Sequence, residues 1–297
     1  MKIKAIIRSM RLRTLPLSLA GVLLGLLLAL QSFSAGWPLI VMLLLTTASL
    51  QVLSNISNEL GDFLHGVDNE QRGGPQYALQ KGELTVEQLR KCVLFMEIFC
   101  YICGVAMILL SFGTLLEWEP AVLLLLGIAA VWAAKHYTLG KRPYGYMAMG
   151  DLFVFIFFGL VPVIGGYFVI SHSLLQREIL LPAITLGLFS VAVLNVNNIR
   201  DMQTDKGKRI TIPLLIGKSA AKVYQSLLII IGWCCAIAFL VIKGGTYGYF
   251  CLLTAPLFLI HLRGVWQKNG SSLDPMLPML VIATFCFSLL LGFGLLM

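Results

Sequence analysis

The feature that most constrains this chain is a series of apolar stretches of roughly 20 residues, each long enough to cross a bilayer as a helix. Nine such stretches are predicted as membrane spans: residues 15–33, 37–60, 91–113, 119–140, 149–170, 179–199, 220–242, 245–264 and 275–297. Only 12% of the residues are charged, against about 25% in an ordinary soluble domain. The sequence therefore predicts an all-α polytopic membrane protein, with a single membrane domain over residues 1–297.

The distribution of basic residues predicts how the spans are oriented. If the N-terminus is cytoplasmic and the spans alternate, 20 of the 22 Lys and Arg residues fall in the N-terminal segment or in cytoplasmic connections, and only Arg177 and Lys243 do not. This bias is what the positive-inside rule requires. The net charge of +8 therefore reflects topology and contact with anionic lipid, and it does not indicate a nucleic-acid partner.

Two short polar motifs follow the second and the sixth predicted spans, and both fall on the predicted cytoplasmic side. The first contains Asn58, Asp62 and Asp68, and the second contains Asn197, Asp201 and Asp205. In each motif an amide and a carboxylate are four residues apart, so that on a helix they share one face. Acidic residues beside a bilayer are costly and usually functional, although solvated acids at helix ends are the simpler alternative.

The chemistry of these motifs points to a divalent cation with an anionic substrate. Mg²⁺ prefers a few carboxylate oxygens together with water and substrate phosphates, and two facing clusters would hold a diphosphate between them. Basic residues near the motifs would suit the same anion: Arg72, Lys81, Lys141, Arg142, Arg200, Lys206, Lys208 and Arg209. Taken singly, each of these also satisfies the positive-inside rule.

The position of the motifs suggests two related halves, because each motif follows the second helix of a group of four. Spans one to four and five to eight would then be parallel repeats around a central cavity. Residues 84–90 are expected to form a short amphipathic helix over the site. Asp151 begins the fifth span and precedes Phe153, Phe155, Phe157 and Phe158; we expect the acid to face the interior and the rings to pack or to stabilise a cation.

Together these motifs resemble those of the UbiA superfamily of intramembrane aromatic prenyltransferases. The similarity covers residues 11–16, 51–85, 135–159 and 195–217, and the nine spans also agree. The spacing of Asn58, Asp62 and Asp68, together with residues 137–151, most resembles the branch that acts on 1,4-dihydroxy-2-naphthoate in menaquinone synthesis. Glu59 stands where the family usually has Asp, which puts its own role as a ligand in question.

The resemblance implies prenyl transfer from a polyprenyl diphosphate to 1,4-dihydroxy-2-naphthoate, with loss of the ring carboxylate as CO₂, in a bacterial cytoplasmic membrane. It implies that Mg²⁺ is bound by Asp62, Asp68, Asp201 and Asp205, assisted by Asn58 and Asn197. Lys141 and Arg200 would join these acids as catalytic residues. The implied substrate-binding residues are Asn58, Asn197, Arg11, Arg72, Tyr137, Lys208 and Asp151.

Two alternatives remain open from the sequence. The same fold could prenylate another aromatic acceptor, such as 4-hydroxybenzoate. A secondary transporter also uses repeats and ionisable residues in a helical bundle, but it places its key charges near the middle of the membrane. Both motifs here lie at one rim of the predicted bundle, which favours the enzyme.

Overall fold

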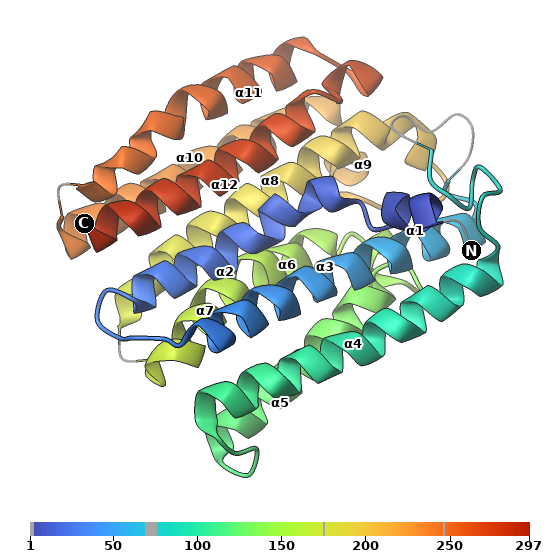
Figure 1. Cartoon of the computed structure of the whole chain (residues 1–297). Helices are drawn as coiled ribbons and strands as arrows, with labels where there is room; N and C mark the ends of the chain where they lie inside the picture. The colour runs from blue at the N-terminus through green and yellow to red at the C-terminus, as the bar shows by residue number, and fades with distance from the viewer. Residues whose placement is uncertain (1–2, 69–75, 175, 246) are drawn as a thin grey trace.

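The computed structural model describes residues 3–68, 76–174, 176–245 and 247–297. Long helices run side by side in this part of the chain, and its two termini lie at opposite ends of the bundle (Figure 1). The described residues form no β-strand, and their isolated β-bridge joins Met147 to Ile210. They contain nine helical segments long and apolar enough to cross a membrane. The prediction of a polytopic all-α membrane protein is confirmed.

The helices fall into two groups of four followed by a ninth span. The first group comprises α1 (Ile3–Ser9) with α2 (Leu15–Ala29), then α3 (Trp37–Leu64), α4 (Val86–Phe112) and α5 (Trp118–His136). The second comprises α6 (Gly150–Phe155), the π-helical turn η3 (Ile156–Leu160) and α7 (Val161–Ser171), then η4 (Arg177–Ile179) with α8 (Leu180–Asp205), α10 (Lys218–Lys243), and η5 (Tyr247–Thr254) with α11 (Ala255–Gln267). The ninth span is η6 (Gly270–Leu273) with α12 (Met276–Leu296), and the short α9 (Ile212–Ile216) precedes α10.

The packing of the helices follows the two-halves pattern expected from the motifs. The second helix of each group packs along the third, α3 on α4 and α8 on α10. The first helices of the two groups, α2 and α7, pack on one another and join the halves. The last helix, α12, then covers both α2 and α8.

The helices that carry the motifs continue past the ends of their apolar runs. We expected the second span to end at residue 60 and the sixth at residue 199, whereas α3 reaches Leu64 and α8 reaches Asp205. One face of each motif is buried against the protein. Each helix therefore continues past the residue at which the hydropathy of the sequence decreases. The separate helix expected at residues 84–90 is wrong. Thr85 instead caps α4, with Gln88 completing a capping box, so this segment is the first turn of the third span.

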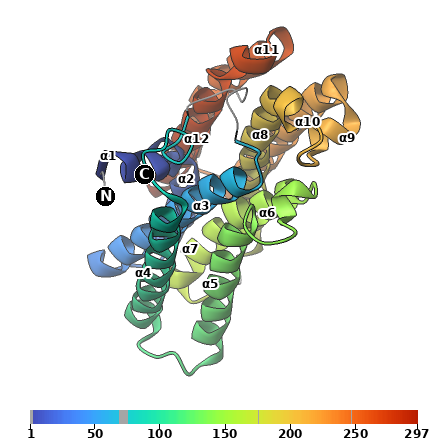
Figure 2. The same ribbon diagram turned by 90° about the vertical axis from the view of Figure 1, so that its right-hand side faces the viewer.

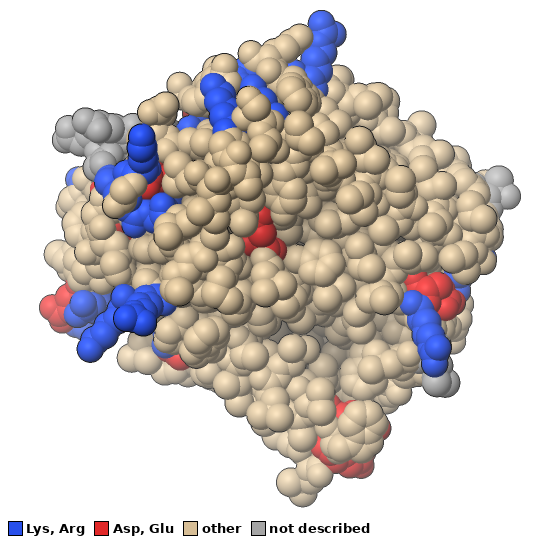
Figure 3. Space-filling model, turned by 180° about the vertical axis from the view of Figure 1, so that it is seen from behind, with Lys and Arg blue, Asp and Glu red and all other residues tan. Residues whose placement is uncertain are grey.

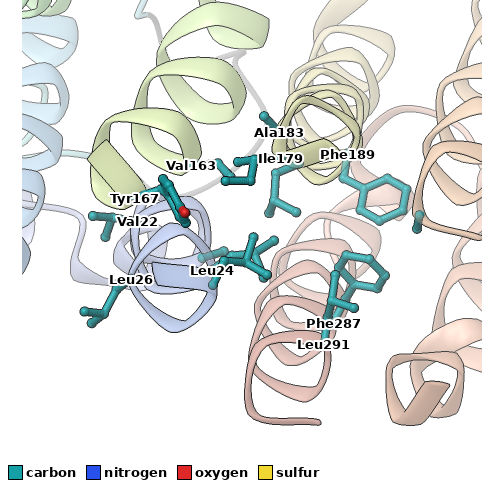
Figure 4. Close-up of a cluster of buried hydrophobic side chains, with 14 of the residues drawn as sticks. Val22, Leu24, Leu26, Val163, Tyr167, Ile179, Ala183, Phe189, Phe287 and Leu291 are labelled. Carbon is teal, nitrogen blue, oxygen red and sulfur yellow. The ribbon is translucent and has the colours of Figure 1, made fainter. Parts of the chain in front are cut away.

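The main hydrophobic core lies where α2, α7, α8 and α12 meet. Figure 4 shows Leu24 of α2, Val163 and Tyr167 of α7, Phe189 of α8 and Phe287 of α12 in one cluster. The rings of Phe189 and Phe287 meet edge to face, with centroids 5.4 Å apart. This cluster fixes α8 relative to the first half of the chain.

A buried polar network fixes the same helix against the second half. The Asn195 side-chain amide donates to Gln225 Oε1 at 2.7 Å, and Gln225 Nε2 lies 2.9 Å from His261 Nε2. His261 Nδ1 lies 3.0 Å from the carbonyl oxygen of Met276, which can only accept, so Nδ1 carries the proton and Nε2 accepts from Gln225. Asn195, Gln225 and His261 are buried. The network therefore joins α8, α10, α11 and α12 just before the second motif.

The surface has the distribution of charge expected of a membrane protein. Seen from behind, most of it is uncharged, and Lys and Arg gather mainly toward the left edge and the top (Figure 3). That left edge is the end where the N-terminus and α9 lie (Figure 1). We call this the polar end of the bundle, because α3 and α8 also finish there.

Candidate active site

A cavity of about 350 Å³ lies between the two halves, and its lining reaches the polar end, which we call the mouth of the cavity. Its charged and amide side chains come from the parts of α3 and α8 nearest the polar end and from nearby loops: Arg11, Gln51, Asn55, Asn58, Asp62, Asn197, Asn198 and Arg209. Its other wall is apolar and extends to residues near the opposite helix ends, including Leu43, Met107, Leu123 and Val169. The cavity therefore offers a polar mouth and a long apolar interior.

The first motif contributes Asn58 and Asp62 to the mouth. Asp62 is buried, and its Oδ1 accepts a hydrogen bond from Tyr146 Oη at 2.7 Å. Thr138 Oγ1 donates to the carbonyl oxygen of Ser57 at 3.0 Å and lies 3.3 Å from Asn58 Oδ1. These contacts bring the loop after α5 directly onto α3.

Gly61 makes this close approach possible. A β-carbon at this position would collide with the backbone and side chain of Thr138. The absence of a side chain at Gly61 therefore lets the loop after α5 reach Asp62.

Asp68 lies beyond the end of α3, after Gly66. Gly66 has φ +66°, and the backbone N–H groups of Val67 and Asp68 then lie 2.9 and 3.3 Å from the carbonyl oxygen of Asp62. The chain thus folds back over the helix end, and Asp68 is half-buried near the mouth.

In the second motif, two arginines neutralise two buried acids. Arg200 Nε and NH2 each lie 2.7 Å from a different oxygen of Asp201, which is a bidentate pair. Arg200 also donates to Asn197 Oδ1 at 2.9 Å and to Asp274 Oδ1 at 3.0 Å. Arg209 NH2 lies 2.6 Å from Asp205 Oδ2 and 3.9 Å from Asp201 Oδ2. Such buried pairs fix side-chain positions more than they add stability.

A short backbone bridge joins the loop after α5 to the segment that follows the second motif. Ile210 N donates to the carbonyl oxygen of Tyr146, and Ala148 N donates to that of Ile210, both at 3.0 Å. Tyr146, which binds Asp62, therefore lies beside the segment that carries Arg209. On the other side of the mouth, Lys208 Nζ lies 3.5 Å from the carbonyl oxygen of Val67. The loops after α3, α5 and α8 thus form one rim.

Aromatic side chains form the wall next to this rim. Tyr137, Tyr144, Phe153, Phe157 and Phe158 all line the cavity. The rings of Tyr144 and Phe153 stack with centroids 3.9 Å apart. Burial raises the pKa of Tyr137 to about 12, with Arg209 lowering it and Asp62 raising it. This hydroxyl therefore stays protonated and can donate a hydrogen bond.

The remaining phenylalanine of the run, Phe155, does not line the cavity. A β-carbon at Gly187 of α8 would collide with the ring of Phe155, so this ring packs against α8. Three rings of the run thus face the cavity and one is packing.

Other predicted site residues take different positions. Arg11 lines the cavity, and its guanidinium lies 3.7 Å from the centre of the Tyr77 ring. Lys141 is exposed on the loop after α5 and is not among the lining residues. Asp151 accepts a hydrogen bond from Tyr224 Oη at 3.0 Å, between α6 and α10, and is also outside the lining. Arg72 lies outside the described residues.

Glu59 faces away from the cavity. Its side chain is fully buried, and Oε1 accepts from the backbone N–H of Leu79 at 2.9 Å. The residue therefore anchors residues 76–84, which we call the cap segment, to α3. This contact gives the longer side chain a structural role, and Glu59 is not among the residues that line the cavity.

Sequence reasoning omitted Tyr146 and Arg209 from the site. Tyr146 sits in a loop whose tyrosines are not ordered by any helical period, so no pattern singled it out. Arg209 follows Asp205 by four residues, a spacing that could have marked it. It was counted only as one basic residue among several.

The donor atoms at the mouth suit a hard cation. Among the described residues, no group of three or more His, Cys, Asp or Glu side chains is close enough together to bind a metal ion. Mg²⁺ does not require such a group, because it commonly binds one or two carboxylates together with water and substrate phosphates. Asn58 and Asp62 present oxygen donors to the cavity from α3, and Asn197 presents one from α8. The residues present therefore fit this ion.

The fold and the cavity together define a class: a multi-pass helical membrane protein with a polar mouth on an apolar intramembrane chamber. Residues 18–295 match the UbiA prenyltransferase family, and the chain belongs to this family.

Two curated relatives match nearly the whole chain. The 1,4-dihydroxy-2-naphthoate octaprenyltransferase of Haemophilus influenzae is 36% identical over 99% of this chain and 96% of its own length. The protein of the same name from Escherichia coli is 34% identical over 98% of this chain and 94% of its own length. A UbiA homologue from Archaeoglobus fulgidus bound to DMAPP and Mg²⁺ has the same fold, with a TM-score of 0.69, 16% identity and coverage of 98% and 99% of the two chains.

Proposed function

We propose that this protein transfers a polyprenyl group from an allylic diphosphate to 1,4-dihydroxy-2-naphthoate, with loss of CO₂, giving demethylmenaquinol for menaquinone synthesis. The observation that carries the proposal is the combination of an acidic and basic mouth with a long apolar cavity in one chamber. The names of the curated relatives supply the acceptor. The mouth suits a diphosphate and the interior suits its hydrocarbon tail.

The two acidic motifs would bind the diphosphate with Mg²⁺. We propose Asp62, Asp68, Asp201 and Asp205 as ligands, with Asn58 and Asn197 assisting; a bound Mg²⁺ would supply Lewis-acid neutralisation of the leaving diphosphate. Arg209 lines the cavity beside these acids, and Arg11 lines it from the start of the first span. Both are placed to receive negative charge as diphosphate departs. Lys208 and Lys141 would contribute from the rim.

At the prenyl C1 a bond to oxygen is exchanged for a bond to carbon, and at the ring carbon the bond to the carboxylate is exchanged for the bond to C1. The bond from the prenyl C1 to the diphosphate oxygen breaks, and diphosphate leaves with the electron pair. The naphthoate ring carbon that carries the carboxylate attacks C1, and the bond to the carboxylate then breaks as CO₂ leaves and returns its electrons to the ring. The faces of Tyr144, Phe153 and Phe157 would stabilise the positive charge that develops on the prenyl carbon.

We also infer where the reaction takes place. The bias of Lys and Arg toward the polar end, together with the positive-inside rule, supports a cytoplasmic position for the N-terminus and the cavity mouth. The bacterial relatives support a location in the bacterial cytoplasmic membrane.

The decisive experiment is prenyl transfer by the purified protein in liposomes, with radiolabelled polyprenyl diphosphate, 1,4-dihydroxy-2-naphthoate and Mg²⁺. We expect labelled product that disappears when the metal is chelated and returns when Mg²⁺ is restored in excess. 4-Hydroxybenzoate should compete poorly. No product, or product unaffected by chelation, would refute the proposal, and preferential use of 4-hydroxybenzoate would change the acceptor.

One further residue is expected to act by positioning. Asp274 binds Arg200 from the connection between η6 and α12, and its side chain is 42% exposed. Because exposed pairs contribute little, Asp274→Asn should lower kcat/KM for the diphosphate donor only about two- to fivefold. The KM for the naphthoate acceptor should not change, since Arg200 adjoins the acids. Steady-state kinetics with each substrate varied in turn would measure this, and an equal loss for both substrates would contradict it.

A further inference from the structure

The N-terminal helix α1 is separated from the first membrane span by a sharp break. Arg11 adopts φ 48° and ψ 51°, in the left-handed region that ends a helix. In the view onto the polar end, α1 lies to one side of the bundle, and the N-terminus points away from it (Figure 2). Although length and composition group Ile3–Ala29 as one candidate span, the backbone does not continue straight through it.

The depth of α1 matches the surface of a bilayer. Asn55 of α3 donates to the carbonyl oxygen of Met10 at 2.8 Å, which sets the level at which α1 ends. Asn55 follows Trp37, the first residue of α3, by 18 positions, or about 27 Å at the helical rise. The hydrocarbon core of a bilayer is about 30 Å thick. With Trp37 taken as the opposite edge of the hydrocarbon core, α1 lies at the boundary between lipid tails and head groups.

One face of α1 packs on the protein and the adjoining face does not. Ala5 and Ser9 are buried, and Ala5 belongs to the hydrophobic cluster that includes Leu53 and Leu79. Ile3 and Ile7, four residues apart on the adjoining face, are 73% and 47% exposed. Lys4 and Arg8 are also exposed, each one residue further along. An apolar edge flanked by basic residues is the pattern of a helix that lies in the interface.

Residues 3–13, which we call the N-terminal arm, carry charge of one sign only. Residues 3–13 contain Lys4, Arg8, Arg11 and Arg13, and no Asp or Glu precedes Glu59 in the sequence. Basic residues held at this depth attract anionic lipid head groups, while their aliphatic stems lie along the lipid.

The arm is also tied to the cap segment, residues 76–84. Arg8 NH1 pairs with Glu83 Oε1 at 2.7 Å, the Arg11 guanidinium lies over the ring of Tyr77, and Arg13 NH2 lies 3.4 Å from Tyr77 Oη. These contacts join residues 3–13 to the segment that Glu59 anchors to α3.

We propose that the N-terminal arm binds the anionic lipid surface at the polar end of the bundle, through Ile3, Lys4 and Ile7 of α1 and through Arg13 after it, and thereby holds the cap segment in place. The lipid is recognised by its phosphate charge and its acyl chains, and not by a specific head group. The inference does not depend on the reaction that the cavity performs.

Hydrogen exchange of the purified full chain in nanodiscs tests this. Amides of α1 and of the cap segment should exchange more slowly with phosphatidylglycerol mixed into phosphatidylcholine than in phosphatidylcholine alone, by about fivefold for each basic side chain at the surface. The double variant Lys4→Gln/Arg13→Gln should abolish the difference. The matched variant Arg90→Gln/Lys91→Gln, which removes two exposed charges from α4, should retain it. Equal exchange of the unchanged protein in the two lipids would overturn the proposal.

A second measurement locates the helix directly. Tryptophan fluorescence added by Ile7→Trp, taken as the difference from the unchanged protein, should be quenched by lipids brominated in their acyl chains. Quenching by aqueous iodide in place of brominated lipid would show that this face lies in water and would also overturn the proposal.

Discussion

Replacing Asp62 by Asn is expected to lower prenyl transfer by roughly 10²- to 10³-fold, the usual cost of removing one group that stabilises developing charge. The amide keeps the size of the side chain and an oxygen that can accept the hydrogen bond from Tyr146 Oη. It removes the negative charge that α3 presents to the cavity mouth. The loss should therefore appear in turnover and in the Mg²⁺ concentration required, measured in liposomes with radiolabelled donor.

A matched control separates this effect from a general loss of stability. Glu97 is a partly buried acid that pairs with Lys135 at 2.7 Å between α4 and α5, and it does not line the cavity. Glu97→Gln makes the same chemical change and should leave the rate close to that of the unchanged protein. A normal rate for Asp62→Asn, at the normal Mg²⁺ requirement, would contradict the proposed metal ligand.

Replacing Gly127 by Leu is expected to make the enzyme prefer short prenyl donors. Gly127 lines the cavity from α5, and a β-carbon there would meet no other atom within 4 Å, so the new side chain would extend into open space. Overfilling an apolar site costs about 1–3 kcal/mol, or roughly 5- to 150-fold in kcat/KM for a long donor. Geranyl diphosphate, whose short tail need not pass this point, should lose much less. Kinetics with donors of increasing length would measure the effect.

The same helix provides the control for this substitution. Leu125 is 66% exposed on α5 and does not line the cavity. Leu125→Phe adds bulk on the outer face of that helix and should leave the preference for donor length unchanged. An equal loss for short and long donors in Gly127→Leu would show that the tail does not follow this wall.

The number and type of the helices could be predicted because the bilayer imposes a simple rule. A segment that crosses hydrocarbon must be apolar for about 20 residues and must satisfy its own backbone hydrogen bonds. Each long apolar run therefore indicated one helix. The ends were less accurate, since α3 and α8 continue beyond the apolar run as buried polar helix. Hydropathy cannot distinguish such a turn from a loop.

The site was predictable in part for a related reason. Asn58 and Asp62, like Asn197 and Asp201, are four residues apart, and helical geometry alone puts each pair on one face. Contacts between loops have no such period. The hydrogen bond from Tyr146 to Asp62 spans 84 positions, and the pair between Arg200 and Asp274 spans 74. Neither leaves a local signal in the sequence.

The sequence by itself determined the membrane class, the nine apolar runs and the two acidic motifs at one rim, because hydropathy, charge bias and helical period are local properties. Only the tertiary structure decided which of the polar residues meet. It placed Arg209 in the cavity mouth, brought Tyr146 onto Asp62 and turned Glu59 toward the cap segment. Asp68, Lys141, Asp151, Asp201 and Asp205 do not line the cavity. These outcomes depend on how loops far apart in the chain pack against α3 and α8, and such packing is fixed by shape and partner atoms.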